Sequence, residues 1–348
     1  MNILPNPFRG AGLDIDALAD VPFPSVAGDR PRSLLRRCPE AGETPLIQSP
    51  ELASACKVGS VIIKDERNRM GLGSFKALGA AYVIARDAED GTAKGTTYVT
   101  ASAGNHGLSV TAGAAAFRAN AVVFVSEHVP EAFAERLRAR GAEVVRGGET
   151  YEESMAAAAQ YADAHGAILL SDSSWPGYVD RPHVLMEGYL VLMDEVFGQI
   201  AEAPTHIFLQ AGVGGLAGAA AAAARAEWQD DPIIVVVEPE AALAISASIS
   251  AGKPVFAPGP ISAMGRLDCK EPSLIALKGL ARDCDYCVTI SEDEGAAGAA
   301  ECEGLGLPTT PSGAAGISAL LAVSAVRGKL GLDAGSRVLT ILSEGPEA

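Results

Sequence analysis

Hydrophobic and polar positions follow two different periods along this chain. Apolar, β-branched runs of five or six residues recur, and alanine-rich stretches with helical spacing separate them. The runs include Ala121–Val125, Ile233–Val237 and Arg337–Leu342, and the alanine-rich stretches include Tyr151–His165 and Ala314–Arg327. Apolar strands that alternate with helices predict an α/β fold with largely parallel, buried sheets.

The length of the chain and its N-terminal segment indicate how the protein is organised. The alternation begins near Val61, whereas residues 1–40 are rich in Pro and Arg with little periodicity, so we expect an irregular N-terminal arm. A length of 348 residues favours about two domains. No run approaches the roughly 18–20 apolar residues of a membrane span. The start, Met1–Pro7, lacks the pattern of a signal peptide.

Charge and cysteine content narrow the class of protein. Lys and Arg number 27 and Asp and Glu 43, which gives a net charge of −16. Nucleic-acid phosphates would be repelled by such a surface, so we expect no nucleic acid and no membrane as partner. Cys284 and Cys287 form a C-x-x-C pair, but no second pair completes a zinc site. We therefore expect no metal, reduced thiols and a cytoplasmic location.

The first candidate for chemistry is Lys76. It ends the run Gly71–Lys76, which lies between a short apolar strand, Val61–Ile63, and an apolar helix from Ala77. A partly desolvated lysine at a positive helix end has a lowered pKa and can act as a nucleophile. The alternative is an ordinary surface lysine, the commoner case.

Two glycine-containing turns each precede a helix. Thr100–Gly107 follows a strand-like run and brings Asn105 and His106 to a helix start, where backbone N–H groups suit an anion. Gln210–Leu216 follows another strand and holds three glycines in four residues, which lets the backbone approach a phosphate. It matches neither G-x-G-x-x-G nor a P-loop. Either turn can also be a plain connection.

A fourth segment closes the chain. The apolar run Val338–Leu342 ends on Ser343, whose hydroxyl would lie at the carboxyl end of a sheet, where ligands of open α/β sheets bind. The alternative is a last strand that simply ends in a loop.

Together these segments resemble the fold-type II pyridoxal-phosphate enzymes, and within them the diaminopropionate ammonia-lyases. The resemblance covers roughly residues 40 to 345. The motifs that carry the closer match are Lys64–Glu66, Gly71–Gly79, Ser171–Tyr178, Met186–Tyr189 and Met264–Pro272. General members of the group share Pro130–Gly148 and Pro311–Gly316.

The resemblance implies a fold like that of the tryptophan synthase β subunit, with two three-layer α/β/α domains and the cofactor in the cleft between them. Residues 41–84 and 191–348 would form the large cofactor-binding domain, and residues 85–190 the small domain with the substrate loop. The group is commonly dimeric, which implies a homodimer.

The resemblance also implies roles for single residues. Lys76 would carry pyridoxal 5′-phosphate as a Schiff base and later take the substrate α-proton. Asn105 would contact the ring hydroxyl, and Ser343 the ring nitrogen. The phosphate would be held by Gly212, Val213, Gly214, Gly215 and Leu216, and the substrate carboxylate by Ser102, Ala103, Gly104 and His106.

Two positions bear on the reaction. Asp172 matches a family carboxylate that would protonate a leaving β-amine, although an Asp that caps a turn is an equal alternative. Ala103 departs from the pattern, because diaminopropionate ammonia-lyases carry Asp there and serine racemases Ser. Since alanine is neither acid nor base, we expect a lyase selective for one α-configuration, most simply L, that does not racemise.

The resemblance therefore implies a β-elimination that releases ammonia from 2,3-diaminopropionate or a closely related β-substituted α-amino acid. A serine/threonine or hydroxyaspartate dehydratase of the same fold is the alternative within enzymes, and Ala103 favours it. A β-replacement synthase is disfavoured because its Asn-Thr-Gly loop is absent. A non-catalytic relative is disfavoured because the other chemical positions are filled.

Overall fold

The strands of the computed structural model, which describes residues 1–346, form one sheet of seven strands and one of four. The strands are β1 Asn2–Pro5, β2 Leu46–Gln48, β3 Ser60–Asp65, β4 Thr97–Ala101, β5 Asn120–Val125, β6 Glu143–Arg146, β7 Ile168–Leu169, β8 His206–Gln210, β9 Ile233–Pro239, β10 Tyr286–Ile290 and β11 Arg337–Leu342. The large sheet has the order β1-β10-β9-β8-β11-β3-β2, and the small sheet β6-β5-β4-β7.

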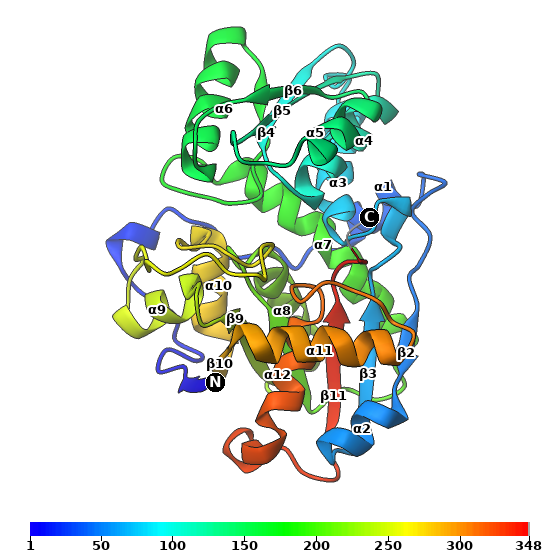
Figure 1. The fold of residues 1–348 in the computed structure, drawn as a ribbon, viewed down its shortest axis with the longest axis vertical. Helices are drawn as coiled ribbons and strands as arrows, with labels where there is room; N and C mark the ends of the chain where they lie inside the picture. Colours follow the sequence, from blue (N-terminus) through cyan, green and yellow to red (C-terminus); the bar gives the residue numbers. More distant parts are fainter. Residues whose placement is uncertain (347–348) are drawn as a thin grey trace.

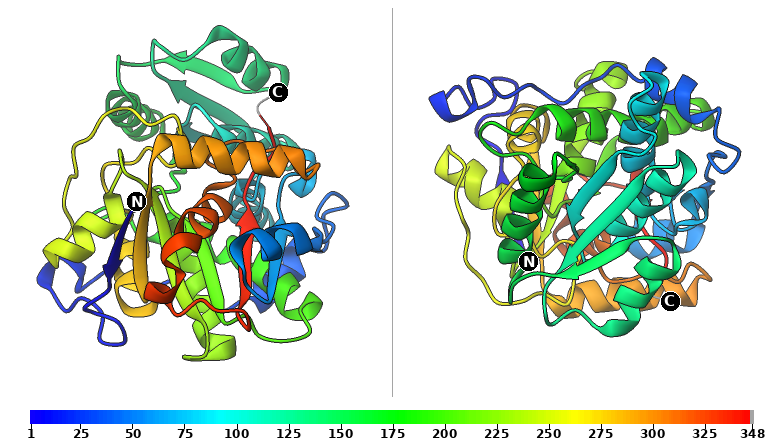
Figure 2. Two further views of the ribbon diagram at one scale, coloured as in Figure 1. Left: turned by 60° about the horizontal axis from the view of Figure 1, so that its bottom comes forward. Right: turned by 90° about the horizontal axis from the view of Figure 1, so that it is seen from above.

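Helices surround both sheets. They are α1 Asp29–Leu35, α2 Pro50–Cys56, α3 Lys76–Glu89, α4 Asn105–Ala116, α5 Glu131–Ala139, α6 Tyr151–His165, α7 Asp180–Gln199, α8 Gly215–Trp228, α9 Ala244–Ala251, α10 Leu274–Asp283, α11 Glu292–Gly304 and α12 Ala315–Val323, with short 3₁₀ helices at Asp16–Leu18, Arg69–Gly71 and Ser324–Leu330. The four-stranded sheet and α4, α5 and α6 lie at the top of Figure 1, and the seven-stranded sheet lies below. The left view of Figure 2 shows the same separation.

The sheets are parallel except at the edges of the large one. Only β1 and β2, its two edge strands, pair antiparallel with their neighbours within the described residues. The expectation of an α/β fold with largely parallel sheets is confirmed. Residues 1–40, expected to be irregular, hold β1 and α1 among segments without regular structure.

Both faces of the large sheet are buried, which explains its continuous apolar runs. In β8, Ile207 and Leu209 pack in one core with α7, α8 and α10, while Phe208 points to the other core with α12. This three-layer arrangement is the one expected of the large domain. The domain limits at residues 85 and 190 stay a prediction, although the four-stranded sheet falls between them.

Helices α3 and α7 touch through backbone atoms at two glycines. A Cβ at Gly188 would lie 2.6 Å from the Leu78 carbonyl oxygen and 2.9 Å from the Gly79 Cα. A Cβ at Gly79 would lie 2.7 Å from the Tyr189 ring. The close crossing therefore requires glycine in both helices, and it fixes the start of α3 against the middle of α7.

A buried ionic network supports the turn before α3. Lys64 donates to Glu195 over 2.6 Å, and Arg69 donates to both Glu195 and Glu66 over 2.7 Å. Lys64, Glu66 and Arg69 are fully buried. Each charge is paired and hydrogen-bonded, as burial of ions requires. The network anchors the segment that connects β3 to Lys76.

Within residues 1–346, no helix combines the length and the apolar character that a membrane span requires. All six cysteines lie in this part of the chain, and each is a free thiol.

Candidate active site

Lys76 is the first residue of α3, at the end of the turn that follows β3. Gly71 and Gly73 in this turn have φ values of +65° and +81°, a conformation that favours glycine. The Phe75 N–H donates to the Ser343 carbonyl oxygen over 3.1 Å, which ties the turn to the end of β11. The Lys76 side chain keeps 22% of its surface exposed, so its amine remains reachable from solvent.

The Lys76 amine forms an ion pair with Asp172, in the segment between β7 and α7. Burial alone would lower the pKa of Lys76, but the Asp172 carboxylate outweighs it and raises that pKa above its ordinary value. Burial alone would raise the pKa of Asp172, and the Lys76 ammonium instead holds it well below its usual range. The expected lowering of the Lys76 pKa is therefore wrong for this state, because the Asp172 carboxylate lies against the amine, a contact that the sequence did not predict.

The turn from Ser102 to His106 connects β4 to α4. Ser102 Oγ accepts from the Gly104 N–H over 3.2 Å, and Ala103 is exposed. His106 is buried, with Nε2 2.8 Å from the Leu170 carbonyl oxygen and Nδ1 without a partner among the described residues. A carbonyl only accepts, so Nε2 carries the proton in the assigned tautomer and Nδ1 is a free acceptor. Burial lowers the pKa of His106, which keeps the ring neutral.

Asn105 is bound to the segment after β11 by Glu344, a residue that sequence reasoning missed. Its side-chain amide donates to Glu344, which directly follows Ser343. Thr310 also donates to the Glu344 carboxylate, and Arg266 Nε lies 3.8 Å from it. Arg266 donates in addition to the Ala103 carbonyl oxygen over 3.2 Å. Glu344 and Arg266 thus connect the substrate-loop candidates to the segment that follows β11, which contains Ser343.

The glycine turn connects β8 to α8. The backbone N–H groups of Gly212 to Ala217 find no backbone carbonyl acceptor within residues 1–346. Gly214 has a φ of +94°, and a Cβ there would lie 2.9 Å from Ile245. A Cβ at Gly212 would lie 3.0 Å from Cys269 Sγ. The Val213 N–H faces the Cys269 thiol instead. N–H groups without a carbonyl acceptor at the start of a 14-residue helix form a site for an anion, and the close neighbours leave room only for glycine at positions 212 and 214.

Leu216 and Ser343 are the other two residues expected to bind the cofactor. Leu216 is buried among apolar side chains, so its contribution to the turn is its backbone N–H. Ser343 is buried, and within the described residues its hydroxyl makes no hydrogen bond, while its carbonyl holds the Phe75 N–H. The Ser343 hydroxyl is therefore free to bind a ligand beside Lys76.

The residues 38–344 match the protein family described as "Pyridoxal-phosphate dependent enzyme". The chain belongs to this family. Pyridoxal phosphate is accordingly its cofactor, and the anion-binding turn, the Lys76 amine and the Ser343 hydroxyl fit the phosphate, aldehyde and ring nitrogen of that molecule in their chemistry.

Within this family, the chain is similar to several individual ammonia-lyases. The diaminopropionate ammonia-lyase of Salmonella typhimurium is 31% identical, over 89% of this chain and 87% of its own length. The L-threonine ammonia-lyase of Geobacter sulfurreducens is 30% identical, over 77% of this chain and 62% of its own length. The structure of the Escherichia coli diaminopropionate ammonia-lyase with an aminoacrylate-PLP azomethine reaction intermediate has a TM-score of 0.88 at 27% identity, and covers 99% of this chain and 93% of that one. The resemblance inferred from the motifs is confirmed.

Sequence reasoning left other neighbours of Lys76 and Asp172 without a role. The hydroxyl of Tyr151, at the start of α6, lies within electrostatic range of Asp172 and of Cys269. The Cys269 thiol interacts with both members of the ion pair, and burial raises its pKa to about 12. Both residues lie in runs that the sequence singles out, yet only the fold brings them to Asp172.

Two polar residues near the site, Tyr178 and Glu187, make contacts within the protein. The Tyr178 hydroxyl donates to the Leu169 carbonyl oxygen over 2.9 Å and accepts from the Ser171 N–H over 3.1 Å. Glu187 accepts from Tyr82 and Arg86. Tyr178 therefore shapes the segment that presents Asp172, and Glu187 connects α7 to α3.

Proposed function

We propose that this enzyme is an ammonia-lyase that removes the β-amino group of 2,3-diaminopropionate, or of a closely related β-substituted α-amino acid, and yields an α-keto acid and ammonia. The observation that carries the proposal is the ion pair between Lys76 and Asp172, which places a base and an acid within hydrogen-bond reach of each other. An amine is a poor leaving group unless it is protonated, so elimination of ammonia requires such an acid. The curated diaminopropionate ammonia-lyases among the relatives support the same substrate class.

The cofactor, when bound, supplies an electron sink for the electrons of the Cα–H bond. We assign its covalent attachment to Lys76, and its phosphate to the N–H groups of Gly212, Val213, Gly214, Gly215 and Leu216. Asn105, held by Glu344, would bind the ring hydroxyl, and Ser343 the ring nitrogen. A neutral serine does not stabilise a protonated ring nitrogen as a carboxylate does, which favours rapid elimination.

The turn from Ser102 to His106 would bind the substrate carboxylate. Ser102 contributes its hydroxyl, and Gly104, whose N–H donates to that hydroxyl, directly precedes α4, where the helix dipole favours a negative charge. His106 presents a free acceptor at Nδ1 in a neutral ring. Ala103 adds no acid or base on this side, so only Lys76 and Asp172 move protons.

The environment of the pair explains how one carboxylate can become an acid. Asp172 stays ionised only because the Lys76 ammonium outweighs its burial. When the Lys76 nitrogen carries no charge, burial raises the pKa of Asp172 and the carboxyl group takes up a proton. Lys76 then takes the α-proton while Asp172 gives its own proton to the departing amine, and the Lys76 ammonium returns a proton to the Asp172 carboxylate at the end of the cycle.

Removal of water from a serine, threonine or hydroxyaspartate substrate is the second candidate function. Ala103 favours it over a typical diaminopropionate ammonia-lyase, and the L-threonine ammonia-lyase of G. sulfurreducens supports it. The reaction would use the same residues, with Asp172 protonating a hydroxyl instead of an amine.

We further propose a cytoplasmic homodimer. The six free thiols agree with a reducing compartment, and the group that the chain resembles is commonly dimeric.

A product assay on purified holoenzyme tests the function. The panel contains L- and D-2,3-diaminopropionate, L-serine, L-threonine and the hydroxyaspartates, and the assay measures ammonia and keto acid together. Two molecules of ammonia per keto acid from L-diaminopropionate support the lyase. One molecule of ammonia per keto acid from a hydroxy amino acid, with diaminopropionate inert, selects the dehydratase instead.

A further inference from the structure

Tyr189, in the middle of α7, carries a buried hydroxyl without a partner. The residue is 1% exposed, and its oxygen makes no hydrogen bond among the described residues. Leaving a buried polar atom unpaired costs about 1–3 kcal/mol, so native proteins rarely do so without a functional reason. Phenylalanine would fill the same space without this cost.

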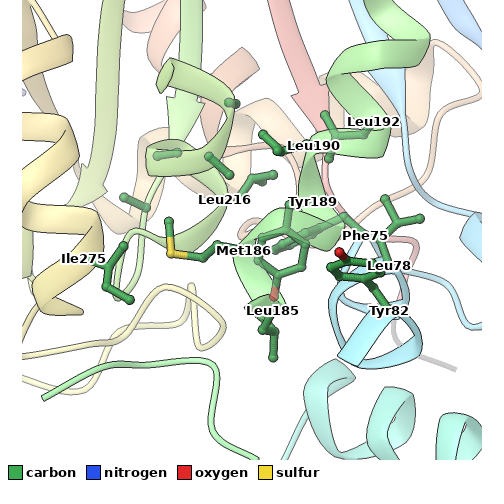
Figure 3. Packing of buried hydrophobic residues seen from close by; sticks show 14 of the residues in the cluster. Phe75, Leu78, Tyr82, Leu185, Met186, Tyr189, Leu190, Leu192, Leu216 and Ile275 are labelled. Carbon is green, nitrogen blue, oxygen red and sulfur yellow. The ribbon is translucent and has the colours of Figure 1, made fainter. Parts of the chain in front are cut away.

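The ring of Tyr189 is held firmly in place. Its neighbours include Phe75, which packs edge-on with ring centroids 4.9 Å apart. Figure 3 shows the ring among Phe75, Leu185 and Met186. Gly79 of α3 and Gly215 of α8 also face the Tyr189 ring. A Cβ at Gly79 would lie 2.7 Å from the nearest ring atom, and a Cβ at Gly215 would lie 3.6 Å from one. The ring is therefore wedged between the helix that begins with Lys76 and the helix that begins with the anion-binding turn.

The position of the ring places the hydroxyl near the reactive amine. Lys76 Nζ lies 6.0 Å from the centroid of the Tyr189 ring, and the hydroxyl interacts electrostatically with Lys76 and with Asp172. Burial raises the pKa of Tyr189, so the hydroxyl stays neutral and keeps its oxygen lone pairs as acceptors. Phe75, Leu185 and Met186 around the ring are apolar, and the charged groups near the hydroxyl are Lys76 and Asp172. Asp172 already accepts from the Lys76 amine, so a Lys76 N–H is the donor that we assign to the hydroxyl oxygen.

We propose that Tyr189 is a positioning residue for Lys76, whose hydroxyl oxygen accepts an N–H of the amine once that amine is released to act on substrate. The inference rests on the proposed role of Lys76 as the base. With Asp172 and Tyr189 accepting two N–H groups, the third position of the nitrogen points to the substrate Cα. The same contact stabilises the ammonium that forms when Lys76 takes the α-proton.

The test compares Tyr189→Phe with a matched control in the holoenzyme. The control is Tyr98→Phe, since Tyr98 is equally buried but its hydroxyl donates to Asp87 over 2.8 Å, away from Lys76. We expect Tyr189→Phe to lower kcat by about 10–100-fold, the loss typical of a hydrogen bond to a charged group, with KM within about twofold. Its melting temperature should stay equal or rise, because an unpaired polar atom is removed, whereas Tyr98→Phe should lower it and leave kcat unchanged.

A second readout does not depend on turnover. The pH titration of the visible absorbance of the lysine-bound cofactor reports the surroundings of the Lys76 nitrogen, and Tyr189→Phe should shift its midpoint whereas Tyr98→Phe should not. If the wild-type enzyme converts no amino acid of the panel, the proposed function fails while this titration still tests the contact. An unchanged titration with an unchanged kcat overturns the inference, as does a loss of activity that only follows a loss of melting temperature. If Tyr189→Phe does not fold, Gly79→Ala, which pushes the ring aside but keeps the hydroxyl, should give the same shift, and its absence overturns the inference.

Discussion

Lys76 and Asp172 form an ion pair although they are 96 residues apart in the sequence. Lys76 follows a strand of the seven-stranded sheet, and Asp172 follows the last strand of the four-stranded sheet. Each side chain reverses the effect of burial on the pKa of the other. The pair therefore joins the two sheets at the point where the chemistry is expected.

The substitution Asp172→Asn tests the acid role. We expect kcat for diaminopropionate to fall by about 10²–10⁴-fold, the usual contribution of a general acid, because the leaving amine loses its proton donor. β-Chloroalanine, whose chloride leaves without a proton, should lose much less. Equal losses on both substrates would remove Asp172 from this role and leave it a part of the site's structure.

The same substitution should change how the cofactor-free protein binds pyridoxal phosphate. Without the carboxylate, burial is the largest influence left on the Lys76 pKa, and it lowers that pKa. More of the amine is then unprotonated at neutral pH, so the rate of cofactor attachment should rise and its pH dependence should move to lower pH. Stopped-flow absorbance over a pH series measures this, and a shift to higher pH contradicts the assigned balance.

Ala103 predicts strict selectivity for one α-configuration. We expect D-diaminopropionate to react about 10²–10⁴-fold more slowly than the L isomer, because no acid or base faces the substrate from the side of Ala103. Ala103→Asp should raise the D activity and leave the L activity similar. Comparable turnover of both isomers by the wild-type enzyme, measured as keto acid, rules this explanation out.

The glycine contact between α3 and α7 predicts a strong effect of one methyl group. Gly188→Ala places a Cβ 2.6 Å from the Leu78 carbonyl oxygen and should destabilise the protein by about 1–3 kcal/mol. It should also lower kcat, because it moves the start of α3. Gly198→Ala is the matched control in the same helix, since its Cβ would meet nothing within 4 Å and should stabilise by roughly 0.5–1 kcal/mol. Urea unfolding that gives the same sign for both variants contradicts the contact.

The buried network predicts a large cost for losing one charge. Glu195→Gln leaves Lys64 and Arg69 buried without a full set of partners, so we expect a loss of about 3–5 kcal/mol in unfolding free energy. Glu131→Gln, which breaks exposed pairs with Arg138 and Arg146, should change little. Similar losses in both variants would show that burial does not decide the energy of these pairs.

Local structure was predictable because local signals determine it. The helix Tyr151–His165 and the strand Arg337–Leu342 have the predicted limits, since a Thr150–Glu153 capping box starts the helix, Gly166 ends it, and the strand is a continuous apolar run. The strand–glycine–helix units at Lys76, Asn105 and Gly215 were equally readable. Their roles toward the cofactor remain proposals.

By itself, therefore, the sequence determined the α/β class, the family and the candidate residues that lie within short motifs. The tertiary structure alone decided which groups meet, namely Asp172 with Lys76 and Asn105 with Glu344, and it placed the Tyr189 hydroxyl within electrostatic range of the Lys76 amine. It also decided the direction of the Lys76 pKa shift. The reason is physical, because helix and strand signals act over a few neighbouring residues, whereas a pKa depends on charges a few ångströms away that the packing of distant segments brings together.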